Sequence, residues 1–283
     1  MAPDGRECHL TKTWRPTARQ MGTSGRDMQK RLGATEVRTI SKLTKCAQCP
    51  LRELDTFRDF TSGQLEFVGS FKTGELNVDA GATIFVESMH SAHLFTVLEG
   101  WAFRYKMLED GRRQIMNYVL PGELIGLQGS VMGEMQHSVE ALSAVKLCVF
   151  ERARLNEIFT KHPNLAYALT WIAAREERIL DENLLSIGRR SALERAAFLL
   201  AFMHVRAKAA GLAPNRRVTV PITQQHVADT LGLSIVHTNK TLKRLSNREL
   251  IRWHDRSCEI IDAGALQDIA GWAHEPEEQR PFI

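Results

Sequence analysis

Two cysteines in the N-terminal part of the chain have a spacing that can support chemistry. Cys46 and Cys49 are separated by two residues, a pattern that occurs in metal sites and in thiol redox pairs, although a single Cys-x-x-Cys is a weak signal. A third cysteine, Cys148, lies in an apolar stretch, where a free cysteine is usually a small core residue. The pattern leaves two roles open for Cys46 and Cys49, a thiol redox pair or a purely structural position.

Two histidines, His90 and His93, are the other candidate ligands, for a metal-dependent enzyme of the cupin type. Such a site needs ligands that converge on one metal from neighbouring strand positions. Side chains three residues apart in a strand point to opposite faces, so this pair is more typical of a solvated turn. The sequence also contains no phosphate-binding glycine loop, metalloprotease helix or nucleophile elbow. We therefore expect a protein that is not an enzyme.

Residues Thr223 to Leu245 have the types and spacing of a helix-turn-helix that reads DNA. Thr223 and Ser234 are N-cap residue types, and each stands at the head of a helical pattern. Between these patterns, Leu231-Gly232-Leu233-Ser234 supplies the tight turn containing glycine that the motif requires. The alternative is a helical hairpin with a solvated basic face.

The second helix of such a motif places its N-terminal residues against base edges in the major groove. Asn239 can pair with adenine, Lys240 can donate to guanine acceptors, and Val236 offers an apolar contact. Lys243 and Arg244, one turn further on, are placed to neutralise phosphates. The residues that we expect at the DNA interface are Thr223, Gln224, Gln225, Ser234, Val236, His237, Asn239, Lys240, Lys243 and Arg244.

The residues around this motif predict a winged domain. A helix is expected over 193–209 and a short strand over 218–220. After the motif, Ile251-Arg252-Trp253 and Glu259-Ile260-Ile261 indicate two strands joined by a polar turn. A helix-turn-helix with a strand before it and a wing after it is therefore expected.

The first half of the chain has a different pattern, in which short runs of β-forming residues alternate with turn signals such as Glu99-Gly100 and Pro121-Gly122. Strands this short and this closely spaced predict an antiparallel sandwich or barrel. The expected strands are 83–87, 94–99, 102–107, 114–119 and 146–151.

A long helix is expected between these two parts, because no glycine or proline occurs from Asn164 to Ile187. Its apolar residues recur at steps of four and three, which is typical of a coiled-coil seam, and two polar residues on it can fix the register. We favour a parallel dimer through this seam; a helix packed against its own domain is the alternative. The seam residues are Leu165, Leu169, Ile172, Glu176, Ile179, Asn183 and Ile187.

Composition limits the class of protein. The chain has 283 residues, of which 43% are hydrophobic and 25% charged, enough for two modest globular domains. It has no apolar run long enough for a transmembrane helix, its N-terminus has no signal-peptide core, and its five cysteines do not suggest a disulfide scaffold. We therefore expect a cytoplasmic protein that makes no membrane contact. Residues 1–45, with ten Lys/Arg and four Asp/Glu, are expected to form a basic flexible arm.

The order of these parts resembles the Crp/Fnr superfamily of bacterial transcription regulators. The resemblance rests on Pro121-Gly122-Glu123-Leu124-Ile125-Gly126 in the first half and on the helix-turn-helix in the second. It implies an α+β protein with an N-terminal antiparallel β-roll of the cyclic-nucleotide-binding type, a long dimerisation helix and a C-terminal winged helix-turn-helix. The expected boundaries are 1–45 for the arm, 46–160 for the roll, 161–190 for the dimerisation helix, 191–273 for the DNA-binding domain and 274–283 for a tail.

The same resemblance implies a homodimer that binds a palindromic site in double-stranded DNA and, as an activator, contacts RNA polymerase. Members that bind cyclic nucleotides hold the phosphodiester with a roll arginine next to a Gly-Glu-Leu turn. Gly122-Glu123-Leu124 keeps that turn, but residues 128–145 contain no arginine or lysine. Because a buried phosphate without a cation is poorly stabilised, cyclic AMP is disfavoured.

Members of the Fnr branch hold a four-iron four-sulfur cluster with N-terminal cysteines and one cysteine of the roll. Cys46, Cys49 and Cys148 match three of these ligands, so Asp55 or Cys8 of the arm would have to complete the set. We therefore expect a redox, oxygen or small-molecule signal received through the roll, with an iron–sulfur cluster as a candidate cofactor. The alternative is a cofactor-free regulator controlled by its abundance.

Overall fold

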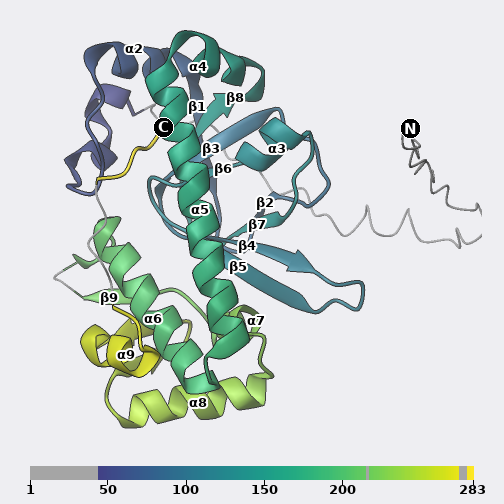
Figure 1. The fold of residues 1–283 in the computed structure, drawn as a ribbon, viewed down its shortest axis with the longest axis vertical. Helices are drawn as coiled ribbons and strands as arrows, with labels where there is room; N and C mark the ends of the chain where they lie inside the picture. The colour runs from purple at the N-terminus through teal and green to yellow at the C-terminus, as the bar shows by residue number, and fades with distance from the viewer. Residues whose placement is uncertain (1–43, 215–216, 274–278) are drawn as a thin grey trace, which may run out of the picture. The chain divides into compact units, whose positions relative to one another are not determined.

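The protein is described by a computed structural model that covers residues 44–214, 217–273 and 279–283. Nearly all of the expected basic arm, including Cys8, lies outside these residues, as does part of the expected tail. Two four-stranded antiparallel sheets, with orders β1-β8-β3-β6 and β2-β7-β4-β5, form the predicted roll, so the expected α+β fold class is confirmed (Figure 1). The strands are β1 Lys72–Val78, β2 Thr83–Phe85, β3 His93–Glu99, β4 Ala102–Met107, β5 Arg113–Val119, β6 Leu124–Ile125, β7 Ser138–Ala141 and β8 Val145–Glu151.

Strand β3 is buried on both of its faces. Successive side chains of a strand point to opposite faces, and here each face packs on a different apolar cluster. Leu94 and Leu98 pack with residues of the long helix, whereas Phe95 and Val97 pack between the two sheets. This double burial explains why the sequence of β3 is a continuous apolar run rather than an alternating one.

Three strands of the roll, β1, β6 and β7, were absent from the sequence prediction, and β6 has only two residues. In β1 the only fully buried residue is a carboxylate, Glu75, so the strand has no apolar alternation to detect. Strand β7 has only four residues. The strand expected over 83–87 ends earlier, at Phe85.

Short helices cover the end of the roll nearest the Cys-x-x-Cys segment. The sequence of α2 begins with a capping box, in which Thr61 Oγ1 accepts from the Gln64 N–H and Gln64 Oε1 accepts from the Thr61 N–H. The short helices are η1 Cys46–Gln48, η2 Pro50–Glu53, α2 Ser62–Phe71, α3 Leu127–Met132, η3 Arg152–Arg154 and α4 Leu155–Lys161.

Two long helices follow, α5 Pro163–Arg189 and α6 Ala192–Ala209. Pro163 occupies the first turn of α5, where a missing N–H costs no hydrogen bond, and Ser191 with Glu194 forms a capping box for α6. Helix α5 runs alongside the roll (Figure 1). Among the described residues, no helix is both long and apolar enough to cross a membrane.

The C-terminal part contains the predicted helix-turn-helix and wing. Its elements are β9 Val218–Val220, α7 Gln224–Leu231, α8 Ile235–Asn247, β10 Ile251–His254, β11 Ser257–Ile260 and α9 Ala263–Ala270. The three strands form an antiparallel sheet with the order β10-β11-β9, so the expected wing and the preceding strand pair with each other.

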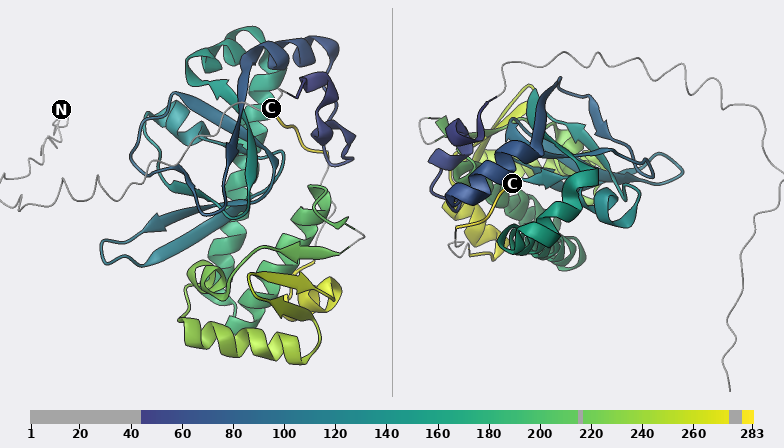
Figure 2. Two further views of the ribbon diagram at one scale, coloured as in Figure 1. Left: turned by 180° about the vertical axis from the view of Figure 1, so that it is seen from behind. Right: turned by 90° about the horizontal axis from the view of Figure 1, so that it is seen from above.

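One apolar core joins the β4–β5 hairpin to this C-terminal part. Phe103 and Ile115 of the hairpin belong to the same buried cluster as Leu199 of α6, Val227 of α7 and Leu242 of α8. The hairpin extends from the roll in Figure 2. The helices of the DNA-binding part are therefore packed against the roll as well as against one another.

Candidate functional site

The turn between α7 and α8 has the geometry that the helix-turn-helix pattern requires. Thr223 Oγ1 accepts from the His226 N–H at 3.2 Å, and Ser234 Oγ accepts from the His237 N–H at 3.3 Å. Gly232 ends α7 with a φ of 65°, a left-handed conformation that favours glycine. Both caps and the turn lie where the sequence predicted them.

The expected DNA-reading residues of α8 share one exposed face. Thr238, Thr241, Leu242 and Leu245 are buried on the opposite face and fix the helix against the domain. The expected contact residues that are exposed are Ser234, Val236, His237, Asn239, Lys240, Lys243 and Arg244. The arrangement leaves the N-terminal half of α8 open to a groove of DNA.

The expected contact residues of α7 are placed differently. Thr223 and Gln224 are half-buried, and only Gln225 is exposed. Gln225 Nε2 donates to Asp229 Oδ1 at 2.7 Å, so its amide is already engaged within α7.

Helix α7 is also tied to strand β5, a contact for which the sequence carried no signal. The Arg113 guanidinium lies 2.8 Å from the Asp229 carboxylate, and Gln114 Nε2 donates to the Thr230 carbonyl at 2.9 Å. The Tyr118 hydroxyl lies 2.8 Å from Thr230 Oγ1. These three contacts connect the sensor part to the first helix of the DNA-binding motif.

The three cysteines expected to act together lie in one apolar cluster. Cys148 of β8 belongs to it. Cys46, the first residue of η1, and Cys49, the extended residue that follows η1, pack against it. Burial raises the pKa of the Cys46 and Cys49 thiols, and raises that of Cys148 to about 12. All three are therefore protonated near neutral pH.

A buried ion-pair network lies beside these thiols and was not predicted from the sequence. Lys72 Nζ lies 2.6 Å from Glu75 Oε1 and donates to the Thr44 carbonyl at 2.8 Å, and Lys146 Nζ lies 3.1 Å from Glu75 Oε2. Burial opposes the ionised form of Glu75, but the hydrogen bonds from both lysines outweigh it and lower the pKa to about 2. The Lys72 ammonium is close enough to oppose the rise in the pKa of Cys148 and Cys46.

The described residues supply three thiols and no fourth ligand for a four-iron four-sulfur cluster. Asp55, the expected oxygen ligand, is exposed and lines a separate cleft with Arg206, so it does not complete the set. In the described part of the chain, no group of three or more His, Cys, Asp and Glu side chains is arranged to hold a metal ion. The donor set therefore does not fit that cluster by itself, because a cubane normally takes four ligands.

Comparison with known proteins agrees with these two structural parts. Residues 75–162 match the cyclic nucleotide-binding domain, and residues 194–269 match the Crp-like helix-turn-helix domain. The transcriptional activatory protein AadR of Rhodopseudomonas palustris is 31% identical over 188 residues, which cover 66% of this chain and 77% of AadR. The chain belongs to the Crp/Fnr family of transcription regulators.

Two further Crp/Fnr proteins extend the comparison. The nitrogen fixation regulation protein FixK of Bradyrhizobium diazoefficiens is 29% identical over 229 residues, which cover 80% of this chain and 93% of FixK. The structure of FixK2 from Bradyrhizobium japonicum matches with a TM-score of 0.61 and 25% identity, and covers 71% of this chain and 98% of that chain.

In this Crp/Fnr protein the Gly-Glu-Leu turn of the roll makes contacts with the helices outside it. Glu123 is buried, and its carboxylate lies 2.8 Å from Arg206 of α6, 3.2 Å from Arg175 of α5 and 3.4 Å from Arg280. Burial opposes ionisation of Glu123, but the three guanidinium groups outweigh it and hold the pKa below its usual range. Gly122 has a φ of 82°, and a Cβ there would lie 2.0 Å from the Phe57 ring, so the turn requires glycine.

The structure corrects the assignment of the helical seam on α5. Leu165, Leu169 and Ile179 are buried within their own chain, so they are not available to a partner helix. The two polar seam residues also bond to the roll: Glu176 Oε2 accepts from Arg104 at 2.6 Å, and Asn183 Nδ2 donates to the Met116 carbonyl at 2.8 Å.

The last two seam residues, Ile172 and Ile187, are half-buried. For the other five seam residues, the heptad period reflects contacts of α5 with its own chain, in agreement with the alternative interpretation.

The two histidines do not converge on a shared site. His90 Nδ1 lies 2.9 Å from the Gly133 carbonyl oxygen in an exposed turn, and His93 is the exposed first residue of β3. Both side chains are exposed, as expected, but His93 lies in a strand and not in a turn.

Proposed function

We propose that this Crp/Fnr regulator works as a homodimer that binds a palindromic DNA site through α8 and responds to redox state through its three-cysteine cluster. The observation that carries the redox part is the meeting of Cys46, Cys49 and Cys148 in one apolar cluster beside Lys72. Cys46 and Cys49 come from the segment before the roll and Cys148 from its last strand, so a bond formed between any two of them would alter how the parts pack.

The chemistry proposed for the cluster is reversible disulfide formation between Cys46 and Cys49. The two thiols lose two electrons and two protons as the S–S bond forms, and hydrogen peroxide accepts them and is reduced to two molecules of water. In the reverse direction a dithiol reductant supplies two electrons and two protons and becomes a disulfide. Because burial raises both pKa values, thiolate is scarce at neutral pH and the reduced state is slow to react. The cluster is thus suited to a sustained oxidative signal rather than to brief exposure.

A route from the thiols to the DNA-reading helix follows from the packing. The cluster that contains Cys148 also contains Leu165 and Leu169 of α5. Further along, α5 bonds to the roll through Glu176 and Asn183, and β5 of the roll bonds to α7. In the proposed dimer, the two α8 helices must fit DNA half-sites about 34 Å apart. A change in packing at the thiols would shift the equilibrium between relative placements of these two helices.

The second copy is proposed to pack on a stripe of α5 that lies one residue from the seam predicted by the sequence. Leu180 is 39% exposed and Leu184 is 71% exposed, although both are large apolar residues. Together with Thr170, Ala173 and Glu177, which are also exposed, they recur at steps of three and four, the spacing of a coiled-coil seam. The stripe consists of Thr170, Ala173, Glu177, Leu180 and Leu184.

The redox proposal is tested by DNA binding of reduced and peroxide-treated protein, with Cys49→Ala compared with Cys258→Ala. Cys49→Ala removes one partner of the proposed disulfide, whereas Cys258 lies in the wing, away from the cluster. We expect oxidation to change the DNA affinity of the native protein and of Cys258→Ala at least fivefold, and to leave the DNA affinity of Cys49→Ala unchanged. Equal affinities before and after oxidation in all three proteins would remove the redox role.

The nature of the centre is tested separately by an absorption spectrum and iron assay of protein purified without oxygen. We expect a colourless protein with free thiols at positions 46, 49 and 148. Iron and a broad visible absorption that bleaches in air would overturn the disulfide chemistry in favour of a metal centre.

A further inference from the structure

A groove lies where the loop between β2 and β3, helix α3 and the segment from η3 to α4 meet. It is lined by residues 90–92 of the loop, residues 130–131 of α3 and side chains between residues 152 and 159, all within the described part of the chain. Its volume of about 780 Å³ is in the range of small-molecule sites. Figure 1 shows α3 beside the roll and α4 directly before α5, so the groove connects the roll to the start of the long helix.

The walls of the groove are apolar and open to solvent. Val131 of α3 is 67% exposed and Phe159 of α4 is 49% exposed. Met89 and Met132, each next in sequence to a lining residue, are 55% and 65% exposed. Exposed apolar side chains that cluster within a polar rim are typical of binding sites. An apolar ligand would therefore remove this surface from water.

A single permanent cation, Arg152, faces these apolar walls. Of the described residues that line the groove, none is acidic and only Arg152 is always charged. At the rim, Glu134 lies 3.7 Å from His90 Nε2 and does not line the groove. Arg152 itself forms no ion pair with any residue that the structure describes.

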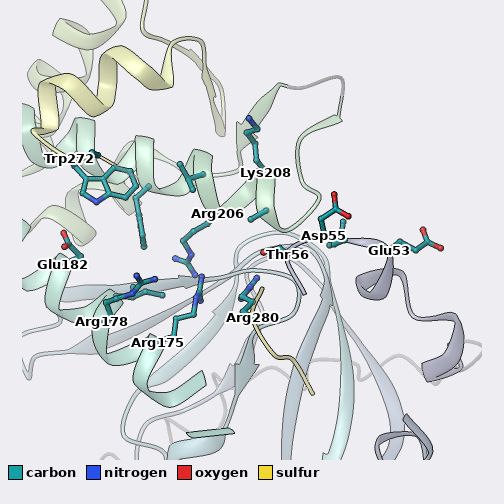
Figure 3. A pocket seen from close by; sticks show the side chains of 16 residues that line it. Glu53, Asp55, Thr56, Arg175, Arg178, Glu182, Arg206, Lys208, Trp272 and Arg280 are labelled. Atoms are coloured by element: carbon teal, nitrogen blue, oxygen red, sulfur yellow. The ribbon is translucent and has the colours of Figure 1, made fainter. Parts of the chain in front are cut away.

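The arginines between α5 and α6 are different, because they already have a counter-ion. In Figure 3, Arg175, Arg206 and Arg280 point toward one another. Each of them lies within 3.4 Å of the Glu123 carboxylate. The charge of Arg152 is not compensated in this way, so it is available to an anion from outside the chain.

Backbone contacts hold Arg152 in place on one side only. Its N–H donates to the Ala92 carbonyl at 2.9 Å, and its Nη1 donates to the carbonyls of Gly133 and Ser91 at 3.2 and 3.5 Å. Its Nε and Nη2 atoms have no hydrogen-bond partner within the described ranges. These two atoms form one edge of the guanidinium, and such an edge binds a carboxylate through two parallel hydrogen bonds.

The loop that forms one side of the groove is fixed before any ligand arrives. The Ser88 N–H donates to the Met135 carbonyl at 2.7 Å, and the Met135 N–H donates to the Met89 carbonyl at 3.0 Å. His90 Nδ1 lies 2.9 Å from the Gly133 carbonyl oxygen, which also accepts from Arg152. Binding to such a loop costs less conformational entropy than binding to a mobile one.

We propose that this groove binds a small organic carboxylate with an apolar tail. The carboxylate would accept hydrogen bonds from Arg152 Nε and Nη2, and the tail would pack on Val131 and Phe159. A monocarboxylate matches the single uncompensated cation, whereas a doubly charged phosphate would retain a negative charge beside apolar walls. The bound ligand would link the roll to α4 and so to the start of α5. The inference does not depend on the thiols or on the dimer.

The proposal is tested by calorimetric titration of the full chain with octanoate and with 1-octanol, which has a chain of the same length and no charge. Arg152→Gln removes the cation of the groove. Arg154→Gln is the matched control, because its guanidinium lies in the same short helix but pairs with Glu157 at 2.9 Å. We expect Arg152→Gln to weaken octanoate binding about tenfold and to change octanol binding less than twofold. Arg154→Gln should leave both affinities within about twofold of the native values.

Phe159→Ala tests the apolar wall separately. Because the ring is half exposed, its removal should leave the fold intact and weaken the binding of both ligands about threefold. The octanol titration also shows whether the groove keeps its shape in Arg152→Gln, since Arg152 holds the loop through Gly133.

Three outcomes would overturn the proposal. They are no octanoate binding by the native chain, octanol binding to the native chain as tightly as octanoate, and a loss of octanoate binding in Arg154→Gln equal to that in Arg152→Gln. Because the titration contains no DNA and involves no thiol chemistry, its result is independent of the redox proposal.

Discussion

At the scale of single residues, two lysines on the exposed face of α8 are expected to have different effects on DNA binding. Lys240 lies in the N-terminal half of α8, which we propose enters the major groove, so Lys240→Ala should lower the preference for the target duplex over a non-specific duplex by about 1–3 kcal/mol. Lys243 lies one turn further on, so Lys243→Ala should weaken binding to both duplexes equally. It should also reduce the slope of the logarithm of the affinity against the logarithm of the salt concentration by about one. Fluorescence anisotropy at several salt concentrations measures both effects, and a uniform loss from both changes would contradict this division of contacts.

His226 gives a prediction on pH. Its ring caps α7, where Nδ1 accepts from the Thr223 N–H, and burial together with the nearby Arg113 lowers its pKa to about 4. The unfolded chain therefore binds more protons between about pH 6.5 and 4, so stability should fall as the pH drops through that range. The partly exposed ring limits the effect to about 1 kcal/mol at pH 5.5.

Chemical denaturation of the native chain and of His226→Gln at pH 7 and pH 5.5 measures this effect. His226→Gln should show a smaller difference between the two pH values, because the replaced side chain does not titrate. Equal pH dependence of stability in both proteins would mean that another group causes the loss of stability. The first candidate is His137, which is buried and has a pKa lowered to about 3.

At the scale of elements, the sequence predicted what is encoded locally. The caps Thr223 and Ser234, the turn at Gly232 and the wing strands follow from residue types and spacing over a few positions. Strand β1 was missed because its one buried side chain is a carboxylate, Glu75, which is stabilised partly by Lys146, a residue distant in sequence. The arginines that meet at Glu123 were missed for the same reason, since each comes from a different part of the chain.

Helix α5 shows the limit of periodicity most clearly. A heptad pattern indicates that one stripe of a helix is buried, but it does not identify the partner that buries it. In this protein the roll covers the most apolar stripe of α5. The neighbouring stripe, with Leu180 and Leu184, is exposed, and we propose that a second copy packs on it. Leu184→Glu should therefore raise the dissociation constant of the dimer at least about a hundredfold, because the symmetric contact would bury two unpaired carboxylates.

Sedimentation velocity over a range of concentrations measures that change. Leu185→Glu is the matched control, since Leu185 is also exposed but lies outside the stripe. A dimer that survives Leu184→Glu, or that is lost equally with Leu185→Glu, would place the interface elsewhere.

At the scale of the whole molecule, the two family domains are not independent bodies within the described residues. The β4–β5 hairpin shares its apolar core with α6, α7 and α8, and polar contacts reinforce the boundary. A change in the roll would therefore reach the DNA-binding motif through packed contacts rather than through a flexible linker alone. The Arg113–Asp229 pair is the contact at this boundary that mutation can test most directly.

Both partners of that pair are mostly buried, with side chains 21% and 12% exposed, and Arg113 also lies 3.6 Å from Glu140. Removal of either partner leaves a half-buried charge, so Arg113→Gln and Asp229→Asn should each destabilise the fold. A double-mutant cycle from denaturation curves should return a coupling free energy of about 1 kcal/mol between the two residues.

Hydrogen exchange should accelerate in α7 and α8 of Asp229→Asn, whereas the β1-β8-β3-β6 sheet should keep its protection, because that sheet takes no part in the contact. A coupling of zero, together with unchanged exchange in α7, would mean that the apolar core alone holds the boundary and that the ion pair does not transmit the position of the roll to α8.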